Sequence, residues 1–185
     1  MVNEGRRVIF ADSMRYGLII NPWRNWGPVG ERVRIPKQIE FEWGYLWAEV
    51  EPVSGDINVW LLGEMNKGWL RPVVEQMPEY WGDKLGLVFD NSSVHKSVSN
   101  SLSGKIGFKF LQAYSPELNP VERLFEELRR HTANRVFDSL VELESALLEV
   151  IDEYSSDKEK VRQLCCYSWI LEQIQPIMIH NVSSM

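Results

Sequence analysis

The chain contains few of the residues that build disulfide frameworks or zinc sites. Its 185 residues include two cysteines, Cys165 and Cys166, and three histidines. Adjacent cysteines rarely form a disulfide, because the closed geometry is strained. No set of cysteine and histidine ligands with zinc-site spacing accompanies them. We therefore interpret both as reduced thiols, as expected of a cytoplasmic protein.

Targeting segments, long apolar runs and repeats are also missing from the sequence. Residues 1–7 are largely polar, and the apolar run that follows is too short for a signal peptide. The longest apolar stretch near the end, 164–179, is interrupted by Glu172 and Gln175, so we expect no membrane span. No internal repeat or low-complexity tract is visible. The composition, 44% hydrophobic and 25% charged, is that of an ordinary globular domain.

Positive charge is in short supply. Lys and Arg number 20 against 26 Asp and Glu, which gives a net charge of −6. This balance counts against tight nucleic-acid binding by the whole surface, because phosphates are neutralised by Lys and Arg. It does not exclude an enzyme acting on nucleic acid, since bound metal ions offset active-site carboxylates. We expect the chain alone to bind DNA weakly.

The apolar pattern predicts an α/β fold. Short apolar or alternating runs predict strands at 7–11, 39–50, 57–62, 85–89 and 108–111. A second apolar stretch at 17–20 continues the strand-like first part, and 21–30 is a predicted loop. Helical spacing predicts helices at 66–80, after 114–122, at 139–154 and at 158–174, with a short one between 91 and 105. This order predicts a mixed five-stranded sheet with helices on both faces. We divide the chain into a catalytic domain, 1–154, and a C-terminal helical extension, 155–185.

Three carboxylates stand where such a sheet would gather them. Asp12 and Asp90 each follow an apolar run and are expected at strand ends, where ligands of open α/β sheets bind. Glu122 opens a later helix. Oxygen ligands of this kind suit Mg²⁺ or Mn²⁺, and two such ions can activate an attacking oxygen and stabilise a leaving one.

Each carboxylate also has a purely structural interpretation, and taken singly the alternatives stay open. Asp12 could be a turn residue, and Asp90 could cap the next helix. Asn119 as N-cap would place Pro120 at the first helical position and Glu122 at the third, close to a capping box.

The segment 114–122 (YSPELNPVE) resembles the signature of DDE transposases of the mariner superfamily, especially the bacterial insertion-sequence branch. Further segments resemble that family in the same order along the chain, from about Val8 to Ile151. They are 11–12 with Arg15 and Gly17, 24–30, 89–91 with His95, and 134–140. Two departures are visible: Ser13 stands where many relatives have Glu, and the interval between Asp90 and Glu122 is a little shorter than usual.

The resemblance implies a ribonuclease H-like fold in which Asp12, Asp90 and Glu122 hold two Mg²⁺ or Mn²⁺ ions. It implies hydrolysis at transposon ends, then strand transfer into target DNA, often at a TA dinucleotide. Family transposases begin with helix-turn-helix domains that read these ends, so we expect such a domain or polypeptide upstream. A homodimer and a location with the nucleoid in the cytoplasm are further expectations.

A few basic residues are candidates for DNA contact. Arg24, Arg32 and Arg34 lie in a loop interleaved with tryptophans, which could grip the DNA backbone or stack on a base. The alternative is a solvated hairpin whose tryptophans are in the core. His95 could position a phosphate or serve a structural role. Arg123 could face DNA or pair with a glutamate on its own helix.

Two other functions remain as alternatives to an active transposase domain. One is a catalytically silent remnant that acts as a binding or regulatory protein. The other is a different ribonuclease H-like nuclease, against which the nine-residue motif argues. The three carboxylates, all present, favour the active enzyme.

Overall fold

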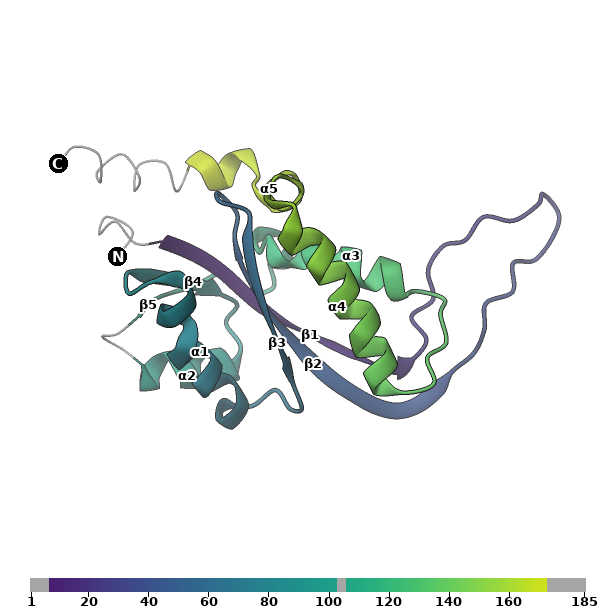
Figure 1. The fold of residues 1–185 in the computed structure, drawn as a ribbon, viewed down its shortest axis with the longest axis horizontal. Helices are drawn as coiled ribbons and strands as arrows, with labels where there is room; N and C mark the ends of the chain where they lie inside the picture. Colours follow the sequence, from purple (N-terminus) through teal and green to yellow (C-terminus); the bar gives the residue numbers. More distant parts are fainter. Residues whose placement is uncertain (1–6, 103–105, 173–185) are drawn as a thin grey trace.

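The computed structural model describes residues 7–102 and 106–172 (Figure 1). The described part forms one five-stranded sheet in the order β3-β2-β1-β4-β5. Strands β2 and β3 run antiparallel to their neighbours, and β4 and β5 run parallel to β1. The strands are β1 (Arg7–Ile19), β2 (Ile39–Glu51), β3 (Asp56–Leu62), β4 (Leu85–Phe89) and β5 (Gly107–Phe110). The helices are α1 (Lys67–Trp81), α2 (Ser93–Ser101), α3 (Val121–Thr132), α4 (Leu140–Ser156) and α5 (Lys158–Cys165).

Helices cover both faces of the sheet, as the sequence predicts (Figure 1). Along β1, Phe10, Met14 and Tyr16 face one side, and Ile9 and Ala11 face the other, because successive side chains of a strand alternate. The first side packs against α3, α4 and α5. The second packs against α1 and α2. Two apolar layers therefore hold the sheet between them.

Strand β1 differs from the expected pair of short strands. It is continuous from Arg7 to Ile19, because it pairs with β2 along nearly its whole length. Its pairing with β4 ends earlier, at Phe10 opposite Val88. Asp12 thus lies inside a strand, and the expectation of a strand end there was wrong. Asp90 directly follows β4, as predicted.

Helix starts agree closely with the sequence. The Asn66 side chain accepts hydrogen bonds from the backbone N–H groups of Gly68 and Trp69 at the start of α1. Ser139 caps α4 in the same way. Helix α3 begins one residue later than expected, at Val121, so that Glu122 lies in its first turn.

The described part of the C-terminal extension, 155–172, packs onto the main core. Val161, Cys165 and Ile170 are buried in the same cluster as α3 and α4. The Lys158 ammonium also pairs with Asp56 at the start of β3, at 2.7 Å. The expected helix at 158–174 breaks after Cys165, and its end falls outside the described residues. The boundary at residue 154 stays a prediction.

The structure also bears on the predicted state of the cysteines and on the predicted lack of a membrane-spanning helix. Both cysteines are free thiols, Cys165 buried and Cys166 partly so. Among the helices of the described chain, none has the length and apolar character needed to cross a bilayer.

Residues 20–38, here called the arm, connect β1 to β2 and extend away from the body of the molecule (Figure 1). Apart from one turn at 29–30 the arm has no regular structure, and every side chain from Asn21 to Lys37 is exposed. A backbone hydrogen bond of 3.2 Å from Ile20 N–H to the Gln38 carbonyl closes its base.

Candidate active site

The structure brings the three predicted carboxylates to one place. Asp12, Asp90 and Glu122 all line a single open cavity of about 690 Å³. They come from β1, from the end of β4 and from the first turn of α3. Asp12 lies just beyond the last β1–β4 pair, where the two strands part and leave room for a side chain.

Asp12 is oriented by its neighbours. Asn119 is buried, and its side-chain amide donates to the Asp12 carboxylate and to the Ala11 carbonyl, each at 3.1 Å. The Ser13 N–H donates to the other Asp12 oxygen at 2.7 Å. Burial raises the pKa of Asp12 to about 6, and repulsion from Asp90 and Glu122 adds to the rise. The carboxylates therefore influence one another across the cavity.

Asp90 is held by His95, whose Nδ1–H donates to the Asp90 carboxylate. This hydrogen bond lowers the pKa of Asp90 to about 2. The imidazole is 1% exposed and stacks on Phe89 at a centroid distance of 4.8 Å. Its Nε2 atom is buried without a hydrogen-bond partner among the described residues. His95 nevertheless borders the cavity that the three carboxylates line, so its packing supports a structural role and its contact with a phosphate stays a prediction.

Glu122 lies at the positive end of the α3 dipole, which favours a carboxylate there. Its carboxylate accepts a long hydrogen bond of 3.4 Å from Arg129, nearly two turns along the same helix. The Arg129 guanidinium is thus the positively charged group that pairs with the Glu122 carboxylate. Neither Arg129 nor Asn119 was assigned this role from sequence, although Asn119 belongs to the nine-residue motif.

The donor set suits a divalent metal ion. Three carboxylates face a cavity open to solvent, and the pKa of Asp12 is raised first by burial and then by the negative charge of Asp90 and Glu122, a charge that a cation would offset. Among residues 7–102 and 106–172, no three Asp, Glu, His or Cys side chains are already close enough to form a coordination shell. The three carboxylates fit Mg²⁺ or Mn²⁺ in chemical type and line one cavity, and coordination would require them to move closer together.

The candidate arginines are not among the residues that line this cavity. Arg24, Arg32 and Arg34 are exposed on the arm. Trp26 is 99% exposed and Trp23 is 43% exposed, so the alternative that places these tryptophans in the core was wrong. Arg123 pairs with Glu126 at 2.8 Å and donates to the Tyr167 hydroxyl at 2.7 Å, as its surface-pair alternative requires. DNA contact by the arginines stays a prediction.

Comparison with known proteins identifies the family to which the chain belongs. A family model described as "DDE superfamily endonuclease" matches residues 7–144, which is more than half of the chain. No curated protein sequence gives a match.

Solved structures of the Mos1 transposase share the fold. The paired-end complex with the left transposon end has a TM-score of 0.67 at 16% identity, covering 96% of this chain and 56% of that one. The mariner paired-end complexes with Mn and with Mg have TM-scores of 0.65 and 0.63, at 16% and 19% identity. These two matches cover 98% and 95% of this chain. The chain spans only 55–57% of the length of these relatives. The match establishes the ribonuclease H-like arrangement of the sheet.

Proposed function

The chain belongs to the DDE superfamily endonucleases, and on that premise we propose that it is the catalytic domain of a DNA transposase. In this proposal Asp12, Asp90 and Glu122 bind two Mg²⁺ or Mn²⁺ ions. The domain hydrolyses a phosphodiester bond at each transposon end and then joins the freed 3′ end to target DNA.

One observation supports this proposal above others. Three carboxylates from three separate elements line one cavity of a ribonuclease H-like sheet, and each has its own means of orientation. Asn119 orients Asp12, His95 orients Asp90, and the first turn of α3 presents Glu122. Partners of this kind hold metal ligands in place and are costly to remove.

In the reaction, the chain itself supplies charge and placement. Bound Mg²⁺ would polarise the scissile phosphate, activate the attacking oxygen and stabilise the leaving one. Asp90 is ionised at neutral pH because His95 holds its pKa low. The pKa of Asp12, raised to about 6, still leaves its carboxyl group mostly ionised at neutral pH. Glu122 would hold a metal ion through its carboxylate, and the Arg129 guanidinium, which donates to that carboxylate at 3.4 Å, would supply positive charge for a nearby phosphate.

The partners form the second part of the proposal. The arm has four basic residues and one acidic residue between Ile20 and Gln38, a local charge of +3 on a chain of net charge −6. This stretch is the positive element suited to a DNA backbone. We further propose that a helix-turn-helix element reads the transposon ends, that two copies act together, that insertion favours a TA target, and that the protein works at the nucleoid.

Metal binding is the first test. Calorimetric titration of Mn²⁺ into the wild type and Asp90→Ala, with and without a duplex carrying a transposon-like end, should show binding in the wild type only. Asp83→Ala is a matched control, because Asp83 is an exposed aspartate in the turn between α1 and β4. It should bind Mn²⁺ like the wild type. Absence of binding in the wild type even with DNA would sink the proposed site.

Strand cleavage is the second test. With Mg²⁺, the wild type should nick a duplex carrying the cognate ends when an end-recognition domain is supplied. Asp12→Asn, Asp90→Ala and Glu122→Gln should each abolish cleavage. Equal cleavage of an RNA–DNA hybrid and duplex DNA would instead indicate a different ribonuclease H-like nuclease.

A further inference from the structure

Both ends of the arm are fastened to the link between α3 and α4, residues 133–139. At the first end, the Asn134 side chain accepts from Trp23 N–H at 3.0 Å and donates to the Trp23 carbonyl at 3.1 Å. The Asn134 backbone N–H adds a bond of 3.2 Å to the Asn21 carbonyl. One asparagine thus occupies the donor and acceptor of one arm residue, as a neighbouring strand would.

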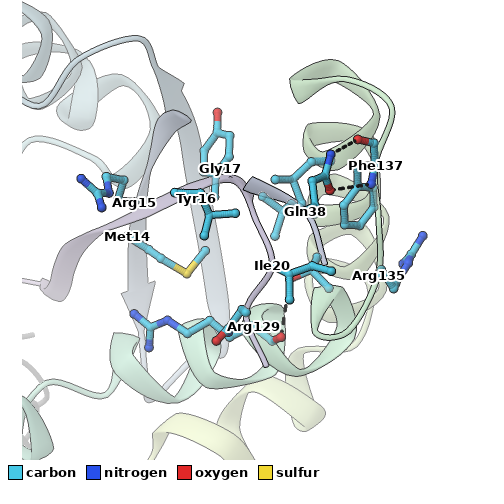
Figure 2. Close-up of a pocket in the computed structure, with 14 residues that line it drawn as sticks. Met14, Arg15, Tyr16, Gly17, Ile20, Gln38, Arg129, Arg135 and Phe137 are labelled. Carbon is cyan, nitrogen blue, oxygen red and sulfur yellow. Dashed lines mark hydrogen bonds between the residues drawn. The ribbon is translucent and has the colours of Figure 1, made fainter. Parts of the chain in front are cut away.

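At the second end the roles are exchanged: the amide side chain belongs to the arm, and the backbone groups that it bonds belong to the link. Gln38 is 9% exposed, and its side-chain amide donates to the Phe137 carbonyl at 2.7 Å and accepts from Phe137 N–H at 3.2 Å (Figure 2). Figure 2 shows the nitrogen and oxygen of the amide both bonded to the Phe137 backbone, beside a cavity that Ile20 and Leu143 line. Two amide side chains, one on the link and one on the arm, therefore clamp both ends.

The backbone of Asn134 is shaped for this contact. Its φ is +59°, a left-handed conformation that Asn adopts more readily than most residues. Asn134 lies two residues past the end of α3, the helix whose first turn carries Glu122. The arm and Glu122 are consequently held at opposite ends of one helix.

We propose that Asn134 and Gln38 are positioning residues that aim the arm at duplex DNA bound at the carboxylate cavity. This inference rests on the proposed function, because it takes the arm as a DNA-contacting element. Between its fastened ends the arm has no regular structure, and a free arm would lose more entropy on binding. Fixing its base reduces that loss and fixes the direction of Arg24, Arg32 and Arg34.

The test measures DNA affinity rather than catalysis. Fluorescence anisotropy with a 30-bp labelled duplex in EDTA would compare the full chain with Asn134→Gly, which keeps the left-handed backbone and removes both side-chain bonds. We expect Kd to rise about tenfold at low salt. The slope of log Kd against log salt should fall by about 1–2, since each lost phosphate contact removes roughly 0.9. Amide exchange in 20–38 should become faster.

A combined variant separates this inference from the proposed function. Arg24→Gln, Arg32→Gln and Arg34→Gln together should weaken binding, and adding Asn134→Gly should then change nothing further. If the arginine variant binds DNA like the wild type, the arm does not contact DNA and the proposed function loses that part. If it weakens binding while Asn134→Gly does not, the anchoring inference is overturned.

Gln38→Glu provides an independent check should Asn134→Gly fold poorly. The change preserves size and the acceptor for Phe137 N–H, but it sets a carboxylate oxygen against the Phe137 carbonyl. We expect the same loss of affinity and salt dependence. Gln76→Glu adds the same charge at an exposed position of α1, away from the arm (Figure 1), and is a control that should leave both unchanged. Wild-type binding by Gln38→Glu would contradict the inference.

Discussion

At the scale of single residues, the two aspartates of the cavity are in opposite electrostatic situations. Burial raises the pKa of Asp12 to about 6, whereas the hydrogen bond from His95 lowers that of Asp90 to about 2. Ionised Asp12 therefore costs the metal-free fold stability, and ionised Asp90 contributes to it. The cost from Asp12 is absent below its unfolded pKa near 4 and fully present above about 6.

This difference predicts the behaviour of Asp12→Asn without metal. As pH rises from 4 to 7, the variant should gain stability relative to the wild type by about 2–3 kcal/mol, because it has no charge to bury. Urea unfolding at several pH values measures the gap. The lost hydrogen bond from either Asn119 or Ser13 is constant with pH and does not affect the trend. A gap independent of pH would contradict the raised pKa of Asp12.

His95 gives a second prediction. His95→Phe keeps a ring against Phe89 but removes the donor to Asp90, so Mn²⁺ affinity should fall about tenfold or more, as for other residues that orient metal ligands. The pKa of Asp90 should rise toward its ordinary value. Stability should change little, since the buried Nε2 atom that lacks a partner is removed as well. His95→Asn, which can restore a donor, should recover part of the affinity. Wild-type affinity in His95→Phe would indicate that only ring packing matters.

Tyr114 gives a third prediction, from backbone strain. It has a φ of +60° and is fully exposed at the rim of the cavity. Tyr114→Gly should stabilise the fold by about 0.5–1 kcal/mol, after allowing for the greater freedom of glycine in the unfolded chain. Tyr114→Ala shortens the side chain without relieving the strain and should give no gain. Thermal unfolding of the two variants distinguishes these outcomes.

At the scale of elements, a buried carboxylate joins β2 to α1. Glu49 is 0% exposed and accepts from the indole N–H groups of Trp47 at 2.9 Å and Trp81 at 2.6 Å, and from the Asn58 amide at 3.0 Å. Burial raises the pKa of Glu49, and the three donors oppose that rise. The group therefore depends on its donors to remain in the core.

Glu49→Gln should destabilise the chain by about 1–3 kcal/mol, because the new amide turns a donor toward indole donors. Urea unfolding at pH 7 measures the loss. Glu79→Gln, an exposed position on α1, should have no effect. Equal stability of the two variants would mean that the indoles find other acceptors.

Most elements were predictable from sequence because apolar period and caps are local signals. Asn66 and Ser139 predict the starts of α1 and α4, and the LGLVF run predicts β4. The continuity of β1 was not predictable, since a polar Asp12–Ser13 pair inside a strand depends on its partner β2. The candidate carboxylates were found through an ordered motif. The burial of His95 and Asn119 could not be predicted from that motif, because it follows from packing between distant elements.

At the scale of the whole molecule, the described C-terminal segment is part of the apolar layer that α3 and α4 form on one face of the sheet. Ile170 is 0% exposed and packs in the cluster shared with α3 and α4. Ile170→Ala should cost about 2–4 kcal/mol, and Gln163→Ala, on the exposed side of α5, should cost almost nothing. Denaturant unfolding of the full chain gives both values. A negligible loss for Ile170→Ala would support an extension independent of the catalytic domain.

The separation of the carboxylates along the chain also sets an order in time. Glu122 follows Asp12 by 110 residues, so at about 5–20 residues per second the ribosome makes it roughly 5–20 s later. During that interval the face of β1 that bears Met14 and Tyr16 is not yet covered by α3 and α4. A nascent chain that stops before α3 has two carboxylates and no third, so the cavity cannot be completed until about two thirds of the 185 residues have been made.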